Sequence, residues 1–189
     1  MRARTSDPRE DTLATPVTER DHSDGRADAP ATLVVYGDYE CPYTRAAHLA
    51  VRRAQPQLGS RMRYVFRHFP LTSIHPHAEH AALAAESASA QGGDGAFWAL
   101  HDQLFRHQDS LDDAHLARHA TAVGLDGAQL AADVASGAHL AHIRADVEGG
   151  VASGVRGTPA LFINGARYSG DRSAATLTAV LEAAASPRP

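Results

Sequence analysis

The alternation of hydrophobic and polar positions predicts a strand–helix–strand unit in the first third of the chain. Residues 32–36 form a short apolar run rich in β-branched side chains, which is typical of a buried central strand. From Pro42 onward the apolar positions follow helical spacing, and residues 63–69 alternate in the manner of a second strand. Two strands joined through a helix favour a parallel pair with a right-handed crossover.

The middle of the chain predicts five consecutive helices. Glycine, serine and aspartate separate them, and these residues favour helix ends and turns. Asp112 and Asp126 each precede a predicted helix, where an aspartate side chain can accept hydrogen bonds from unpaired N–H groups. An apolar stripe over residues 97–105 predicts core packing. The five helices are expected near residues 77–91, 95–107, 112–121, 127–136 and 138–153.

Two further strands and a helix are expected near the end of the chain. Thr158-Pro159 leads into an apolar run over residues 160–163, and a further short run follows Asn164-Gly165. Asn-Gly between two alternating runs is a strong hairpin signal. A final helix is expected over residues 174–185.

One domain accounts for most of the sequence. The chain has 189 residues, which suffice for one well-formed core and not for two ordinary ones. We assign the α/β class, with residues 29–186 as a single domain and a helical insertion near residues 76–137. Residues 1–28 are polar and show no hydrophobic period, so we expect them to form a mobile, disordered tail.

Composition narrows the classes of function. The net charge is −4 and no basic stripe with interleaved aromatic residues appears, so a nucleic-acid partner is not expected. No apolar stretch approaches the ~20 residues that span a bilayer, and the first residues lack the apolar core of a secretory signal. These features predict a cytoplasmic protein without a membrane partner. The single cysteine fits a reducing compartment, and the oligomeric state stays open.

Cys41 has the clearest chemical context. It lies between a predicted strand and a predicted helix, where free N–H groups and the positive end of the helix dipole favour a thiolate. Arg45 adds a positive charge one turn on, and the Thr44 hydroxyl is placed to donate a hydrogen bond to the sulfur. The alternative role is that of a small buried apolar side chain. The position directly before Pro42 favours reactivity.

Pro159 is the second notable residue. The segment Gly157-Thr158-Pro159 immediately precedes a predicted strand, where a proline is tolerated because its missing N–H is not needed. The Thr158–Pro159 bond can be cis or trans, and sequence position alone does not choose between the two.

Two segments carry a family resemblance. Residues 36–44 read YGDYECPYT, and residues 157–165 read GTPALFING. Together with RHFPL at residues 67–71 and HPHA at residues 75–78, they resemble the DsbA-like branch of the thioredoxin superfamily. The chain is most similar to its stand-alone cytoplasmic members and to the related domains fused to sodium/proton antiporters. The resemblance implies a thioredoxin fold with an inserted helical subdomain.

The resemblance also assigns roles to residues of both segments. It makes Cys41 the nucleophile of a Cys-Pro-Tyr-x motif and Pro159 a cis-proline. It implies that Thr158 presents its backbone to a bound thiol or peptide. Pro42 and Tyr43, inside the motif, are then expected to contact the substrate.

Thr44 departs from the family pattern, because the family's motif ends there in a second cysteine. A dithiol enzyme resolves a mixed disulfide with a thiolate of the same molecule, which threonine cannot supply. The chain is therefore not expected to be a self-contained disulfide oxidase or reductase. We count Thr44 among the active-site residues because its hydroxyl is expected next to Cys41.

The leading interpretation is a monothiol thiol–disulfide oxidoreductase. Cys41 exchanges mixed disulfides, and an external low-molecular-weight thiol, glutathione or another, is the resolving partner. No tightly bound cofactor is expected, and the partners are this small thiol or a protein disulfide. Two alternatives stay open. One is a thiol-dependent transferase or isomerase of the kappa glutathione-transferase kind, and the other is a non-catalytic binding module that holds a peptide or partner near Pro159.

Nearby polar residues are given structural roles. His75, His77 and His80 lie close together, but no convincing third metal ligand follows at a standard spacing, so no metal site is assigned. Capping and solvation are the favoured roles of these histidines. Asp38 and Glu40 flank the cysteine and are interpreted as turn residues.

Overall fold

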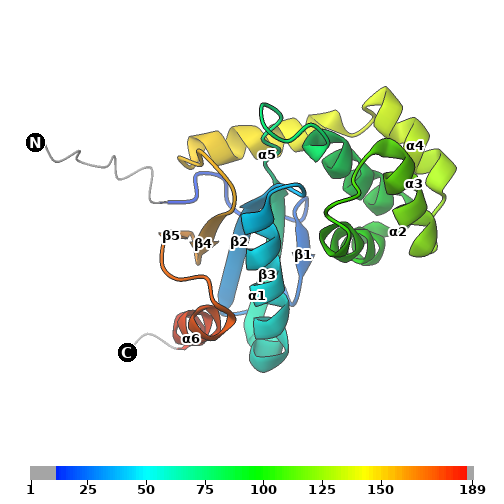
Figure 1. Cartoon of the computed structure of the whole chain (residues 1–189). Coiled ribbons are helices and arrows are strands. Elements are labelled where there is room, and N and C mark those ends of the chain that lie inside the picture. The colour runs from blue at the N-terminus through cyan, green and yellow to red at the C-terminus, as the bar shows by residue number, and fades with distance from the viewer. Residues whose placement is uncertain (1–11, 187–189) are drawn as a thin grey trace, which may run out of the picture.

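A mixed sheet of five strands forms the centre of the structure, a computed structural model that describes residues 12–186 (Figure 1). The strands lie in the order β1-β3-β2-β4-β5. β2 and β3 are parallel, and the other neighbouring pairs are antiparallel. The strands are β1 (His22–Asp24), β2 (Ala31–Gly37), β3 (Met62–His68), β4 (Ala160–Ile163) and β5 (Ala166–Tyr168).

The helices follow the predicted pattern. α2 contains a kink at Gly92 and Gly93, whose backbone angles are not helical, and this kink separates the two helices expected there. The carboxylates of Asp112 and Asp126 accept backbone hydrogen bonds at the starts of α3 and α4, which confirms both caps. No helix within residues 12–186 is long and apolar enough to cross a membrane. The helices are α1 (Pro42–Leu58), α2 (Ala78–Arg106), α3 (Asp113–Ala122), α4 (Gly127–Ser136), α5 (Leu140–Ala152), α6 (Ala174–Ala185) and a short 3-10 turn, η2 (Gly59–Arg61).

Both predicted strand connections form. α1 joins β2 to β3, which pair in parallel along their whole length. The hairpin between β4 and β5 turns at Asn164 and Gly165, with φ values of 49° and 82°. Two consecutive positive φ angles are what a tight hairpin turn requires, and asparagine and glycine adopt them most readily.

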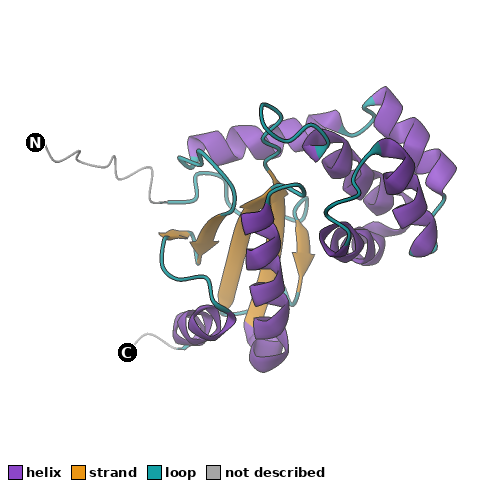
Figure 2. Ribbon diagram, in the orientation of Figure 1, coloured by secondary structure: helices purple, strands orange, loops and turns teal. Residues whose placement is uncertain are grey.

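Different elements cover the two faces of the sheet, because successive side chains of a strand point to opposite sides. Leu33 and Val35 of β2 belong to the larger core, which also contains buried residues of α1, α2, α3, α4 and α6. Val34 and Tyr36 belong to a smaller core on the other face, against which Val147 of α5 packs. Figure 2 shows α1 lying in front of the strands and α5 running across one end of the sheet. The predicted stripe over residues 97–105 is buried in the larger core.

The predicted tail over residues 1–28 requires a correction. Residues 1–11 lie outside the described part of the chain, but His22–Asp24 form β1 and pair with β3. Upstream of this strand, the Arg67 guanidinium pairs with the Asp21 carboxylate, with Nε 2.6 Å from Oδ1. Arg67 also donates hydrogen bonds to two backbone carbonyls of the same segment. These contacts order a segment that has no hydrophobic period of its own.

Candidate active site around Cys41

The sheet topology brings the two motif segments together. β2 ends at Gly37, just before the turn that carries Cys41, and its neighbour β4 begins at Ala160. The pair is antiparallel, with Tyr36 opposite Ala160. Pro159 therefore lies at the same end of these two strands as the turn that carries Cys41. Residues more than a hundred positions apart in the chain therefore share one site.

Cys41 is the residue before the first turn of α1. Its sulfur faces residues 157–159, which we call the proline loop. Its backbone is extended, with φ −73° and ψ 117°, and Pro42 is the first residue of the helix. The Sγ atom donates a hydrogen bond to the backbone carbonyl of Thr158 at 3.3 Å, and the Thr158–Pro159 peptide bond is cis. Cys41 is 3% exposed, so its free thiol is covered by the surrounding loops.

Thr44 is buried beneath the turn, and its hydroxyl pairs with a different group from the one expected. Its Oγ1 accepts a hydrogen bond from the backbone N–H of Asp38 at 3.4 Å. A Cβ atom on Gly37 would lie 2.8 Å from Thr44 Cγ2, so the methyl group lies close to the end of β2. The expected hydrogen bond from Thr44 to the sulfur is not formed: the hydroxyl oxygen accepts the Asp38 N–H, and the sulfur instead pairs with the Thr158 carbonyl.

Pro42 and Tyr43 are both exposed at the start of α1. The Tyr43 side chain borders a groove of about 500 Å³, and this residue is 71% exposed. Ala46 and Ala47 of α1 also line this groove, together with residues 169–172. The expected contact of Pro42 and Tyr43 with a substrate stays a prediction.

Asp38 and Glu40 hold a second loop against the turn that carries Cys41. The buried Asp38 carboxylate accepts hydrogen bonds from the backbone N–H groups of Glu40 and Leu71, each at 2.8 Å. It also pairs with His75 Nδ1 at 2.7 Å. The Glu40 carboxylate accepts the backbone N–H of His77 at 2.6 Å. The two residues are turn residues, as interpreted, and in addition they fasten the segment from Leu71 to His77 beside the turn.

The three neighbouring histidines do not act together. His75 and the backbone of His77 contact the turn that carries Cys41, whereas His80 pairs with Asp113 of α3, with Nδ1 2.6 Å from Oδ1. Each of these contacts involves a different carboxylate.

Gln108 supports the turn that carries Cys41, a role that sequence reasoning missed. Its Nε2 atom donates hydrogen bonds to the backbone carbonyls of Tyr39 at 2.7 Å and Cys41 at 3.0 Å. It lies just after α2, and no local pattern marks a glutamine whose partners are backbone atoms of a distant turn. The helical part of the fold therefore contributes directly to the geometry around Cys41.

A chain of buried polar groups runs beneath the turn. The Tyr39 hydroxyl lies 2.9 Å from His101 Nδ1, and His101 Nε2 lies 3.3 Å from His48 Nδ1. Burial lowers the pKa of His48 to about 3, because the interior disfavours a charged imidazole, and the nearby Arg52 cation acts in the same direction. Burial also holds the pKa of His101 well below its usual value. Both rings are neutral near pH 7 and act as hydrogen-bond bridges.

A known family matches the part of the chain that carries this site. The family model described as thioredoxin matches residues 17–183. The chain belongs to the thioredoxin family. Both motif segments of this thioredoxin-family chain lie inside the matched range, and so do all six residues that the sequence assigned to the site.

Solved structures confirm the predicted fold. A thioredoxin-like oxidoreductase from Silicibacter pomeroyi is 26% identical, with a TM-score of 0.76 over 88% of this chain and 93% of that one. BdbD from Bacillus subtilis, in its oxidised form, is 18% identical, with a TM-score of 0.77 over 93% of this chain and 98% of that one. The thioredoxin-family chain thus has the DsbA-like fold, a thioredoxin core with inserted helices.

Curated relatives are named as sodium/proton antiporters. NhaA 3 of Salinispora tropica is 44% identical over 171 residues, which are 90% of this chain and 26% of that protein. NhaA 1 of Mycolicibacterium gilvum is 43% identical over 87% of this chain and 27% of that protein. The thioredoxin-family chain spans about a quarter of the length of these relatives. This agrees with the predicted similarity to antiporter-fused domains.

Proposed function

We propose that this thioredoxin-family chain is a monothiol thiol–disulfide oxidoreductase with Cys41 as its nucleophile. The pairing of the Cys41 sulfur with the Thr158 carbonyl, beside a cis proline and at the start of α1, carries the proposal. A helix N-terminus stabilises a negatively charged sulfur. Thr44 occupies the place of a resolving cysteine, so the second thiol has to come from outside the chain.

The proposed reaction is an exchange in two steps. The Cys41 thiolate attacks one sulfur of a mixed disulfide R–S–S–R′, a bond forms between Sγ and the RS sulfur, and R′S⁻ leaves and takes up a proton. The thiolate of an external small thiol, R″S⁻, then attacks the RS sulfur. The Sγ–S bond breaks, R–S–S–R″ departs, and Cys41 is again a thiolate. Over the whole cycle the enzyme is neither oxidised nor reduced.

The proline loop and the start of α1 are proposed to bind the substrate. When the Cys41 thiol loses its proton, the Thr158 carbonyl no longer accepts a hydrogen bond from sulfur and can accept one from an N–H group of the substrate. The exposed ring of Tyr43 and the neighbouring Pro42 border the groove described above. We place the reaction in a reducing compartment, the cytoplasm, where small thiols are plentiful.

The reaction is tested with a fluorescent peptide that carries glutathione in a mixed disulfide. The reduced full-length chain is mixed with this peptide, and intact-protein mass spectrometry follows the adduct on Cys41. We expect one adduct per chain, its removal by added glutathione, and multiple turnovers only when both substrates are present. Cys41→Ser should show none of these, and the surface variant Leu49→Ala should behave as wild type. A folded protein that forms no adduct with any small-thiol disulfide, or that never releases it, contradicts the proposal.

A further inference from the structure

Three histidines converge on one buried glutamate outside the Cys41 site. The Glu86 Oε1 atom lies 2.7 Å from His22 Nε2 and 2.8 Å from His68 Nε2, and Oε2 lies 3.2 Å from His142 Nδ1. These residues come from β1, β3, α2 and α5, and we call them the Glu86 cluster. Their side chains are buried except that of His142, which is 32% exposed. The reaction proposed for Cys41 uses none of them.

Two imidazoles of the Glu86 cluster also face a second carboxylate with their other ring nitrogen. His22 Nδ1 lies 3.4 Å from Asp94 Oδ1, and His142 Nε2 lies 3.9 Å from Asp146 Oδ1. Histidines that bind metal ions usually show this arrangement, because the outer carboxylate fixes the ring and makes the inner nitrogen a stronger donor. The cluster therefore has an inner donor set, with one outer carboxylate at the limit of hydrogen-bond distance from His22 and another at ion-pair distance from His142.

We propose that His22, Glu86 and His142 bind one divalent transition-metal ion, with Zn²⁺ as the best fit. Their donor atoms all lie within 4.8 Å of one another. Two imidazoles and one carboxylate form a donor set that proteins use for Zn²⁺ while leaving a fourth position for water or a ligand. Donor atoms at ordinary zinc distances stand about 3.4 Å apart in a tetrahedron, so the two contacts of Glu86, 2.7 Å with His22 and 3.2 Å with His142, need to widen by less than about 1 Å.

A hydrogen bond from His68 supports the proposed role of Glu86 as a metal ligand. It reaches the Oε1 atom of Glu86 from β3, a different element from those that carry His22 and His142. The carboxylate orientation is thereby fixed from outside the donor set.

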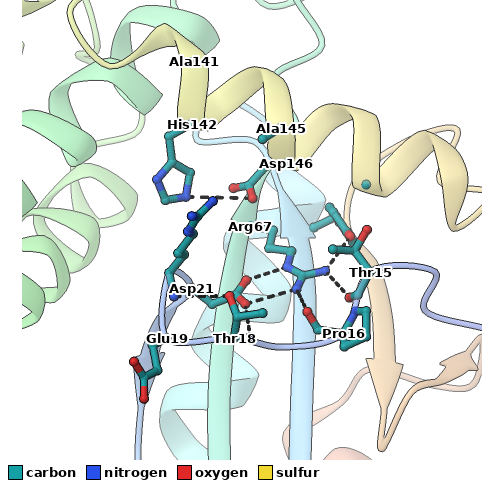
Figure 3. Close-up of a pocket in the computed structure, with 13 residues that line it drawn as sticks. Thr15, Pro16, Thr18, Glu19, Asp21, Arg67, Ala141, His142, Ala145 and Asp146 are labelled. Carbon is teal, nitrogen blue, oxygen red and sulfur yellow. Dashed lines mark hydrogen bonds and ion pairs between the residues drawn. The ribbon is translucent and has the colours of Figure 1, made fainter.

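The site is accessible through a neighbouring pocket. A cavity of about 890 Å³ lies between residues 15–21 and α5, and its wall includes His142 and Asp146 (Figure 3). Arg20 and Arg67 also line this pocket, and the Arg67 charge is paired with the Asp21 carboxylate at 2.6 Å. The pocket gives a metal ion a path from solvent to His142 and leaves room for a small ligand on the open position.

A second group of similar composition is less suited to binding a metal ion. His48, His101 and Asp102 also hold their donor atoms within 4.8 Å of one another. There, however, the Arg52 guanidinium contacts Asp102 Oδ1 through Nε at 2.9 Å and through a terminal nitrogen at 2.7 Å. A side-chain cation already neutralises that carboxylate, whereas the contacts of the Glu86 carboxylate within residues 12–186 come from imidazoles.

Metal titration of the full-length chain tests the proposal. Zn²⁺ binding is measured by calorimetry, and Co²⁺ binding by its visible absorption, both in a Cys41→Ser background so that the thiol contributes no ligand. We expect one ion per chain, a Co²⁺ spectrum of four- or five-coordinate nitrogen and oxygen ligation, and a rise in melting temperature of about 5 °C with excess Zn²⁺. His142→Ala should weaken binding at least about tenfold.

His80→Ala is the matched control, because His80 pairs with the Asp113 carboxylate outside the Glu86 cluster and is more exposed than His142. It should bind as tightly as the background protein. Circular dichroism checks that His142→Ala is folded, and Glu86→Gln provides a second loss of a donor. Binding that is absent, or that His142→Ala and His80→Ala affect equally, overturns the proposal and makes the Glu86 cluster an ion-pair network only.

Discussion

The sulfur of Cys41 donates its hydrogen bond to the backbone carbonyl of Thr158, 117 residues away in the sequence, and not to a neighbour in its own helix. The residue in the position of a resolving cysteine, Thr44, instead stabilises the turn through the Asp38 N–H. The site therefore pairs a free cysteine with the loop before β4, and the single cysteine of the sequence has no second thiol within the chain with which to form a disulfide.

Restoring the second thiol should change the type of reaction. In Thr44→Cys the new sulfur lies one helical turn from Cys41, so we expect an intramolecular disulfide after mild oxidation and attack of the new thiol on any Cys41 adduct. Counting free thiols before and after oxidation, together with adduct lifetime by mass spectrometry, measures both effects. Thr44→Ser, which keeps the hydroxyl, should retain a long-lived adduct. A Thr44→Cys protein whose adduct persists as long as in wild type would show that the two side chains do not meet.

Removing the Asp38 carboxylate should destabilise the active-site turn. Asp38→Ala leaves two backbone N–H groups and His75 Nδ1 without their acceptor in a buried environment. We expect a loss of about 3 kcal/mol in the free energy of unfolding, measured by urea denaturation. Asp113→Ala removes a carboxylate whose side chain is 62% exposed, and it should cost less than about 0.5 kcal/mol. Equal losses in the two variants would contradict the role of Asp38 in holding the neighbouring loop beside the turn.

The buried His48 should make the protein sensitive to mild acid. Its pKa falls from 6.5 in the unfolded chain to about 3 in the folded one, so between these values the unfolded chain binds the additional proton. Stability from this group is complete above pH 6.5 and falls as the pH is lowered toward 3, by about 1.4 kcal/mol per pH unit. His48→Gln should therefore lose about 2 kcal/mol less than wild type between pH 7 and pH 5 in urea unfolding. Identical losses would mean that His48 is not held neutral by burial.

Two glycine substitutions should act in opposite directions. A Cβ atom at Gly150 of α5 would lie 2.8 Å from ring carbons of Phe69 and 3.1 Å from Tyr36 Cδ1. Gly150→Ala should therefore cost about 1–3 kcal/mol by overpacking the smaller core. Gly95 is exposed in α2 with nothing within 4 Å of such an atom, so Gly95→Ala should stabilise by about 0.5 kcal/mol. Thermal unfolding compares the two, and a stabilising Gly150→Ala would contradict the close packing of α5.

Local patterns were sufficient for most of the secondary structure. Asn164-Gly165 fixes a hairpin because its turn needs two positive φ angles, and Gly92-Gly93 interrupts the helix around it. β1 was missed because it is only three residues long and His22 within it is a buried polar residue. Such a strand has too few positions to show a period, and its pairing partner β3 lies some forty residues further along.

The sequence by itself determined that Cys41 stands at the junction of a strand and a helix, that Thr44 cannot resolve a disulfide, and that a Thr-Pro loop precedes a late strand. These are properties of neighbouring residues and of side-chain chemistry. Only the tertiary structure decided that Gln108 supports the turn that carries Cys41 and that three histidines contact Glu86. Such contacts join elements that are far apart in the chain, and a single polar side chain carries no local mark of the partner that folding will bring to it.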